Sequence, residues 1–473
     1  MPRWSSRSNA CLVWLLLVAG LPGEAVGKPR PAVTPHPQLV LRSVSGDEVI
    51  SIDAYRGSKV LLIHLAPWSP ASWEALALWT EKTRHLVEDK QLVVLGVMLE
   101  RRRDRARLFA QWKQLDLPLL FDPLNLAGVA QVPTVVGIDE QGFTRVVDPK
   151  PEEFEKRFVR RKFKVNKLAL RAPILELPDP KYTRRMAGEA RSAAGWRAHG
   201  DALVLAGKPV QLEEALRTYR DAITMNPKDW LAFYRLGVAH MIRFDRPEHQ
   251  PGDFQAAIDA WRSAARLCRK GNIPRAPIEQ FGLREEKPGS MYGWIKTARK
   301  AIKARGETPV ALDAEPASIE SAKPRKKFRS SRKKPAPESG SPDAAAEDTR
   351  SLVEVETAIV RGLSSKHRSI VQVVLIFRPA GGRGAQWDNT GPPLRVRIDP
   401  PEGVKVDRRL LTAANPAETA SAEPRMVNVE VKRSKKARKQ TITLKARAFY
   451  RVTATGGDAQ SLYRDFEVSI PPK

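Results

Sequence analysis

Residues 60–73 read VLLIHLAPWSPASW, and this stretch decides the fold of the first part of the chain. Residues 60–65 form an apolar run of the kind found in strands that are buried on both faces. A short turn follows, and apolar side chains then recur at helical spacing over residues 72–88. The stretch therefore predicts a buried strand, a turn and a helix in direct succession.

The segments around this stretch alternate between strand and helix patterns throughout residues 38–150. Two short strands that flank a turn at residues 45–48 come first. The expected elements after the helix are an apolar strand at 92–98, a basic helix at 103–114, and strands at 119–122 and 132–139. Strands that alternate with helices in this way favour an α/β domain.

This region resembles the redoxin type of thioredoxin-like domain along nearly all of residues 38–148. Three matches carry the resemblance: Tyr55-Arg56-Gly57-x-Lys59 before the strand, the Trp-Ser-Pro-Ala-Ser turn at 68–72, and Val132-Pro133-Thr134. In that family the turn reads Trp-Cys-Pro-x-Cys, and the proline of the third match is cis and faces the active cysteines. The resemblance therefore implies a thioredoxin-like fold and a cis bond before Pro133, where the alternative is an ordinary proline that starts a strand.

Both cysteine positions of the family's turn hold serine in this chain, at Ser69 and Ser72. Dithiol exchange requires a thiolate, which a serine hydroxyl cannot replace. A serine nucleophile would need an adjacent base held by a third group, and His64 is expected to point into the core instead. We therefore interpret both serines as degenerate positions, one of which caps the following helix, and expect no catalytic residue here.

The first 27 residues have the pattern of an export signal. Arg3 and Arg7 precede an apolar core at 11–21, and small residues at 25–27 offer a cleavage site. The alternative is an uncleaved signal that tethers the chain to a membrane. Cleavage would leave Cys268 as the single cysteine of an exported protein, which excludes a self-contained disulfide oxidoreductase.

Residues 191–303 resemble tetratricopeptide repeats, which are stacked helix–turn–helix units. Two units are clear, and a degenerate third unit is expected to end the stack with Trp294 and Ile295. Because two units are fewer than such arrays need on their own, this array is expected to pack on a neighbour. Its concave surface is expected to offer Tyr219, Tyr234 and Arg235 to a peptide.

The rest of the chain divides into connecting segments and a second strand-rich region. We expect linkers at 28–37 and 304–349 and a basic connector at 151–190. Residues 350–473 contain six segments of alternating polarity, which predict an all-β sandwich. This region resembles the N-terminal sandwich of periplasmic disulfide-interchange proteins, although the interval 450–463 lacks the cysteine pair of that family.

The net charge and the spacing of the histidines limit the kinds of ligand that the chain is expected to bind. Its net charge of +28 attracts polyanions, but the basic runs are scattered and have no aromatic platform for nucleic acid. An acidic protein, anionic lipid headgroups or envelope polymers are the favoured partners. The seven histidines lie singly, without metal-ligand spacing, and no phosphate-binding glycine loop follows a strand, so no metal or cofactor is expected.

The favoured hypothesis is an exported adaptor without enzymatic activity, whose three folded regions bind envelope or secreted proteins. The surface around Trp68, Pro70 and Pro133 would retain the binding of extended peptides after the loss of thiol exchange. Two alternatives stay open: a redoxin that relies on a partner's thiol or on Cys268, and a binder of anionic envelope polymers.

Overall fold

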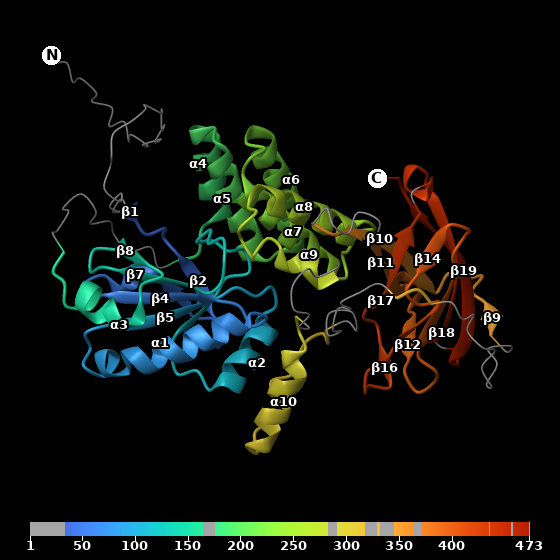
Figure 1. Cartoon of the computed structure of the whole chain (residues 1–473), viewed down its shortest axis with the longest axis horizontal. Coiled ribbons are helices and arrows are strands. Elements are labelled where there is room, and N and C mark those ends of the chain that lie inside the picture. The colour runs from blue at the N-terminus through green and yellow to red at the C-terminus, as the bar shows by residue number, and fades with distance from the viewer. Residues whose placement is uncertain are drawn as a thin grey trace, which may run out of the picture.

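The computed structural model describes residues 34–163, 176–281, 291–316, 329–331, 345–363, 370–434, 436–455 and 457–472. The predicted export signal at residues 1–27 lies outside these ranges. Figure 1 shows three units: an N-terminal unit (34–163), a helical unit (176–281) and a β unit (345–472). Residues 291–316, here called the strap, contain helix α10 (Trp294–Ala304).

The N-terminal unit is built on one eight-stranded sheet with the spatial order β1-β8-β7-β4-β5-β6-β2-β3. The central strands β4, β5 and β6 are parallel, and β7 runs antiparallel to β4. The strands are β1 (Thr34–Pro35), β2 (Val40–Ser43), β3 (Val49–Ser51), β4 (Val60–Leu65), β5 (Val93–Met98), β6 (Leu119–Phe121), β7 (Thr134–Ile138) and β8 (Phe143–Val147). The buried strand at 60–65 is thus the centre of the unit.

The two faces of this sheet are covered differently. On one face, Leu61, Ile63 and Leu65 of β4 share an apolar cluster with helices α1 (Pro70–Glu88), α2 (Arg103–Lys113) and α10. On the other face, Val60 and Leu62 pack with Val132 and with Ile273 from the helical unit. A 3-10 helix (Ile52–Tyr55) precedes β4. The sheet order and the strand–turn–helix at β4 confirm the prediction of a thioredoxin-like α/β unit.

Residues 151–190, expected to be a basic connector, contain three helical elements. Helix α3 (Pro151–Phe154) continues into a π-helical turn (Glu155–Val159), and α4 (Pro180–Ala190) begins the helical unit. Phe154 and Phe158 are buried against the α1 side of the sheet. Aromatic residues spaced between the basic ones therefore anchor the first part of this stretch to the N-terminal unit.

The helical unit consists of α4, α5 (Ala193–Ala206), α6 (Pro209–Met225), α7 (Trp230–Phe244), α8 (Asp253–Leu267) and α9 (Ala276–Phe281). Consecutive helices from α4 to α8 pack on one another. A side chain at Gly237 would place its Cβ 2.5 Å from the ring of Trp261 on the next helix, so this close helix contact requires glycine. The assignment of these helices to the tetratricopeptide family stays a prediction.

Trp294 and Ile295 do not cap the helical unit, and that expectation is wrong. Both lie on α10, and Trp294 stacks on Trp112 of α2 with ring centroids 5.9 Å apart. The apolar face of the strap thus finds its partner in the N-terminal unit.

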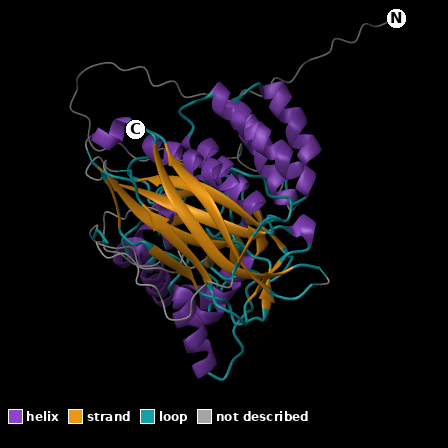
Figure 2. Ribbon diagram, turned by 90° about the vertical axis from the view of Figure 1, so that its right-hand side faces the viewer, coloured by secondary structure: helices purple, strands orange, loops and turns teal. Residues whose placement is uncertain are grey.

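The β unit contains two sheets whose inner faces share one apolar core. One sheet has the order β10-β11-β17-β14, and the other contains the long strands β18 and β19. Figure 2 shows the strands of this unit from the side that faces the viewer. The strands are β9 (Ala346–Glu347), β10 (Val353–Arg361), β11 (Ile370–Pro379), β12 (Gln386–Asp388), β13 (Leu394–Asp399), β14 (Val404–Val406), β15 (Leu410–Ala413), β16 (Ala420–Ser421), β17 (Arg425–Arg433), β18 (Ile442–Thr453) and β19 (Gln460–Ile470). The kinship with disulfide-interchange proteins stays a prediction.

A single apolar cluster joins the three units. It contains Leu124 of the N-terminal unit, Phe244 and Phe254 of the helical unit, and Val374 and Met426 of the β unit. The helices therefore pack on a neighbour, as expected, and they do so against both the N-terminal unit and the β unit.

Candidate functional site

The serine turn between β4 and α1 satisfies its polar groups locally. Ser69 is the N-cap of α1, and its Oγ accepts the backbone N–H of Ser72 at 3.3 Å. Ser72 is fully buried, and its Oγ accepts the N–H of Ala66, also at 3.3 Å. The indole of Trp73 donates to the carbonyl of Pro67 at 2.8 Å. Both hydroxyls are thus used to hold backbone, which is the usual role of serine at a helix start.

His64 does not serve these serines as a base. Its side chain is buried, and neither ring nitrogen has a hydrogen-bond partner in the described part of the chain. Because side chains alternate along a strand, His64 lies on the face of Val60 and Leu62, away from α1. Burial, and then the nearby His36, lower the pKa of His64 to about 3, so the imidazole is neutral. No nucleophile–base pair forms here.

The segment before Pro133 is bound by the helical unit. The peptide bond between Val132 and Pro133 is cis. The side chain of Asn272, between α8 and α9, accepts the N–H of Val132 at 2.9 Å and donates to its carbonyl at 2.7 Å. The N–H of Ile273 donates to the carbonyl of Ala130 at 3.3 Å. Two side-chain hydrogen bonds from Asn272 and one backbone hydrogen bond from Ile273 thus hold residues 130–132 against the helical unit.

The same contact reaches the serine turn through apolar packing. Ile273 is only 2% exposed and shares a cluster with Ala66 and Val132, against which Trp68 also packs. A Cβ at Gly271 would lie 2.5 Å from the carbonyl oxygen of Ala130, so only glycine allows this approach. Residues 271–273 of the same chain therefore already cover the backbone of residues 130–132 beside the turn.

Arg235 connects the helical unit to the loop that leads into this segment. Its guanidinium contacts Asp201 at 2.5 Å and donates to the carbonyls of Leu124, Asn125 and Leu126 at 3.1, 2.8 and 3.3 Å. Arg235 is 4% exposed, so the expectation that it faces an external peptide is wrong. An arginine set among apolar residues of a helix, as Arg235 is in α7, is a sequence signal that could have indicated this buried role.

The two tyrosines predicted to bind a peptide also face inward. Tyr219 is fully buried and its hydroxyl donates to Asp201 at 2.8 Å, so its predicted place on an open surface is wrong. Tyr234 is partly exposed and packs against both clusters that border the 122–132 loop. Burial raises the pKa of both hydroxyls. The surface expected to bind a foreign peptide thus holds the N-terminal unit.

Asp122 begins this loop and shapes it from within. Its two carboxylate oxygens accept the N–H groups of Leu124 at 3.2 Å and Leu126 at 2.7 Å. Burial raises the pKa of Asp122 to about 6, although the backbone hydrogen bond from Leu126 and the charge of Arg235 oppose the shift. The loop is thus ordered by a buried acid on one side and a buried arginine on the other.

Two parts of the N-terminal unit stay open to solvent. Pro70 and Ala71 are exposed at the start of α1, and Trp68 is partly exposed. A groove of about 1000 Å³ runs between α1 and the α2–β6 connection, lined among others by Trp73, Ala77, Val87, Lys113 and Leu117. These surfaces, unlike the 130–132 edge, are free to meet a partner.

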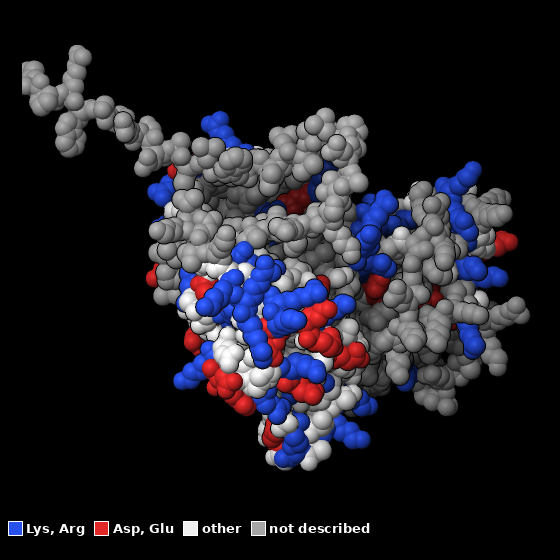
Figure 3. All heavy atoms as spheres, turned by 60° about the vertical axis from the view of Figure 1, so that its left-hand side comes forward, with Lys and Arg blue, Asp and Glu red and all other residues white. Residues whose placement is uncertain are grey.

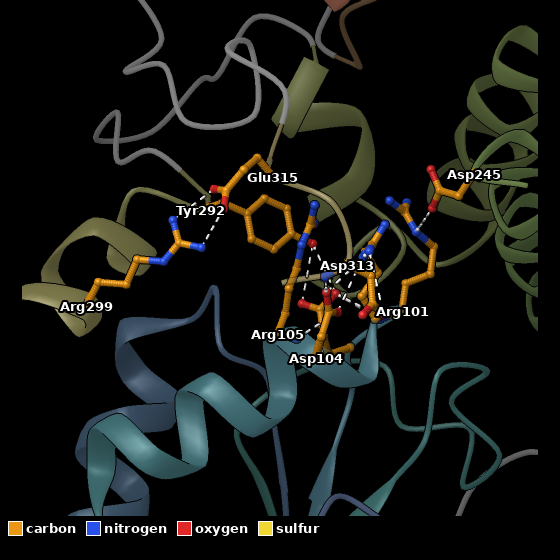
Figure 4. A network of polar contacts seen from close by, with 10 residues as sticks. Arg101, Asp104, Arg105, Asp245, Tyr292, Arg299, Asp313 and Glu315 are labelled. Carbon is orange, nitrogen blue, oxygen red and sulfur yellow. Dashed lines mark hydrogen bonds and ion pairs between the residues drawn. The ribbon is translucent and has the colours of Figure 1, made fainter. Parts of the chain in front are cut away.

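A charged network surrounds the carboxyl end of β5. Glu100 accepts the N–H groups of Arg101 and Arg102 and lies 3.3 Å from the hydroxyl of Tyr292 in the strap. Burial raises the pKa of Glu100. Figure 4 shows Arg105 beside the ring of Tyr292, with its guanidinium 4.3 Å from the ring centre. The strap therefore closes this end of the sheet.

The described ranges were also searched for groups of metal ligands, free cysteines and helices that could cross a membrane. No group of three or more potential metal ligands occurs among the described residues. Cys268 is a partly exposed free cysteine at the end of α8. No helix in the described part of the chain is both long and apolar enough to cross a bilayer. Figure 3 shows Lys and Arg interleaved with Asp and Glu on the face of the N-terminal unit that is turned to the viewer, so this face is not uniformly basic.

The sheet order and the strand–turn–helix at β4 give the N-terminal unit a thioredoxin-like fold, with Ser69 and Ser72 in the turn. No family model matches the sequence, and no curated protein matches it significantly.

Solved structures similar to the chain include a protein described as the thiol:disulfide interchange protein DsbE of Chlorobium tepidum, with 21% identity, a TM-score of 0.24, and coverage of 26% of this chain and 93% of that one. A DsbF homologue from Corynebacterium diphtheriae has 20% identity and a TM-score of 0.24, over 28% of this chain and 88% of its own. A secreted disulfide oxidoreductase of Mycobacterium tuberculosis has 15% identity and a TM-score of 0.22, over 25% and 93%.

Proposed function

We propose that this chain is an exported adaptor of the cell envelope that binds other proteins and catalyses no reaction. The observation that carries the proposal is the use of both serine hydroxyls in backbone hydrogen bonds, with no base beside them. The thioredoxin-like domain then acts as a folded support. Export rests on the signal pattern of residues 1–27.

The partner surface of this adaptor is the exposed part of the N-terminal unit. Trp68 and Pro70 lie on this surface where α1 begins. The groove between α1 and the α2–β6 connection forms the rest of the surface. The groove combines aromatic and aliphatic side chains with Lys113, whose ammonium lies 4.0 Å from the ring centre of Trp112. An apolar floor with a few charged groups is typical of sites that bind protein segments.

Site-specific photo-crosslinking tests this proposal. A benzophenone amino acid is placed at Ala71 beside the turn or at Ala77 in the groove, and at Val210 as a matched control. Val210 is 84% exposed on α6. The proposal predicts a discrete crosslinked species from positions 71 and 77 in the producing cells and none from position 210. Identical patterns at all three positions would contradict it.

The two alternatives give different results in simple assays. A redoxin that relies on Cys268 would reduce insulin, and Cys268→Ser would abolish the activity; the adaptor proposal predicts background rates for both proteins. Binding to anionic polymers would weaken steeply with salt, whereas contact through the apolar groove would change little.

A further inference from the structure

A cavity of about 480 Å³ lies where the N-terminal unit, the helical unit, the strap and the β unit meet. Its floor is apolar and is formed by Met241, Phe244, Phe281 and Met426, all of which are buried. Pro379 and Ala385 of the β unit extend this apolar lining. The volume falls within the range of roughly 300–1000 Å³ that is usual for sites that bind small molecules.

Charged side chains from every unit form the wall of the cavity, and most of them are paired. Figure 4 shows Arg101 directed toward Asp245, with 3.2 Å between the charged atoms, and Glu315 bound to Arg299. Arg102 is bound to Asp104 at 3.2 Å. These pairs neutralise one another and leave little net charge.

Two arginines in the wall have no such partner. Within the described residues, neither Arg246 nor Arg378 has a carboxylate within ion-pair distance, although both line the cavity. Arg246 follows α7, and Arg378 lies on β11, so they come from different units. Arg378 donates to the carbonyl of Phe244 at 2.9 Å, and its guanidinium lies 4.9 Å from the centre of the Phe244 ring. Both cations thus border the apolar floor.

We propose that this cavity binds a small apolar carboxylate, with the carboxylate between Arg246 and Arg378 and the apolar group on the floor. Arginine is suited to this role because its planar guanidinium binds carboxylates through charge-assisted hydrogen bonds. Burial lowers the pKa of Arg378, and the charges of Asp245, Glu356, Glu354 and Asp253 oppose part of this shift. An anion in direct contact with the guanidinium would offset the remaining desolvation. A long fatty chain fits less well, because the paired charges of the wall surround the floor.

This inference is independent of the adaptor proposal, since the cavity shares no lining residue with the groove that contains position 77, and position 71 lines neither of them. It also predicts a coupling between units. A ligand held by one arginine from the helical unit and one from the β unit stabilises their contact, so the melting temperature rises with ligand concentration.

Ligand-observed saturation-transfer NMR on the purified protein tests the proposal with two acids, 4-phenylbutyrate and N-acetyl-phenylalanine. Each is compared with its own amide, which keeps the shape and removes the charge. The first acid represents a free metabolite and the second the end of a peptide, so their relative affinities distinguish the two sources. We expect at least one acid to bind and its amide to bind about tenfold more weakly, the effect of losing a charge-assisted hydrogen bond.

Three variants locate the binding. Arg246→Gln is expected to weaken binding of the acid about tenfold without affecting the fold, since Arg246 makes no ion pair. Ala422→Trp, at an exposed position that lines the cavity, is expected to block binding. Arg217→Gln, on the exposed face of α6, is the control and should bind like the wild type.

Several outcomes would overturn the proposal. These are no signal from either acid at millimolar concentration, equal affinity for acid and amide, or unchanged binding in Arg246→Gln and Ala422→Trp. If the acids bind but positions 71 and 77 yield no crosslinked partner, only the adaptor proposal is overturned. If the crosslinked partner appears but neither acid binds, only the carboxylate site is overturned.

Discussion

The turn at residues 66–73 and the loop at residues 122–132 lie near each other at one end of the same sheet. The turn satisfies its polar groups locally, whereas the loop combines local hydrogen bonds with contacts from distant residues. The turn is closed by hydrogen bonds within itself, from Ser69, Ser72 and Trp73. The loop depends on Arg235 and Asn272, which are more than one hundred residues away in sequence.

This difference shows that local and long-range contacts hold two neighbouring parts of one thioredoxin-like domain. The turn is held by serine hydroxyls, which are well suited to cap a helix. The loop, which borders the turn, contributes to the contact between the N-terminal unit and the helical unit.

Removing Arg235 should have the largest effect, because it breaks the loop's attachment to the helical unit. Arg235→Ala leaves Asp201 buried without its cation and three carbonyls without a donor. Loss of one partner of a buried ion pair costs about 3–5 kcal/mol. Urea unfolding would measure the loss. Arg217→Ala, at an exposed position of α6, should stay within about 0.5 kcal/mol of the wild type, and an equal loss in both variants would contradict the role of Arg235.

Asn272→Ala should loosen the other end of the loop. The backbone N–H and carbonyl of Val132 both lose their partner, at a cost of about 2 kcal/mol. Hydrogen exchange at the Val132 amide should accelerate. Asn272→Asp is the matched control, since it keeps an acceptor for the N–H and should protect that amide; unchanged exchange in Asn272→Ala would show that the contact is weak.

His64 is close in sequence or pairing to both regions. It lies on β4, which leads into the turn, and it is paired with Thr134 of β7, which follows the loop. Its folded-state pKa of about 3 lies below the ordinary value of 6.5. The folded state therefore favours the neutral ring, and the stability from this preference is present above pH 6.5 and lost as the pH falls toward 3. Each pH unit in this window costs about 1.4 kcal/mol.

His64→Leu should remove that acid sensitivity. Between pH 6.5 and pH 5 the wild type should lose about 2 kcal/mol through His64, and the variant should lose less. His36, whose pKa burial lowers to about 4, contributes a remaining slope in both proteins. Unfolding free energies at several pH values measure the effect, and parallel pH profiles would show that His64 is not the source.

The smallest effect is expected at the turn itself. Ser69→Ala removes the N-cap of α1 and should cost about 1 kcal/mol. Ser69→Asp keeps an acceptor at the same position and should be close to the wild type in thermal melting. A large loss in Ser69→Asp would mean that the hydroxyl does more than cap the helix.

The sequence predicted the parts of this structure that depend on local patterns. The buried strand, helix α1 and the six long strands of the β unit, β10, β11, β13, β17, β18 and β19, follow from periodicity. The cap follows from residue type at a helix start. The cis bond before Pro133 was expected from the resemblance to redoxins and not from a local pattern.

The sequence did not predict the long-range contacts. Asn272 stands in a Gly-Asn-Ile-Pro stretch that is typical of a turn, and nothing nearby indicates a partner 140 positions earlier. The repeat pattern places Tyr219 and Arg235 on an open surface, because repeat helices expose one face when considered alone. Packing of whole units on one another decides which polar residues become buried, and local patterns do not contain that information.

The most direct test of the account places thiols at both serine positions of the turn. Ser69→Cys/Ser72→Cys, made in a Cys268→Ser background, is assayed for reduction of insulin by dithiothreitol. We predict a rate equal to the serine protein, because Asn272 and Ile273 occupy the backbone beside the turn. Rapid turnover by the cysteine pair would contradict the claim that the chain has closed this face of its thioredoxin-like domain.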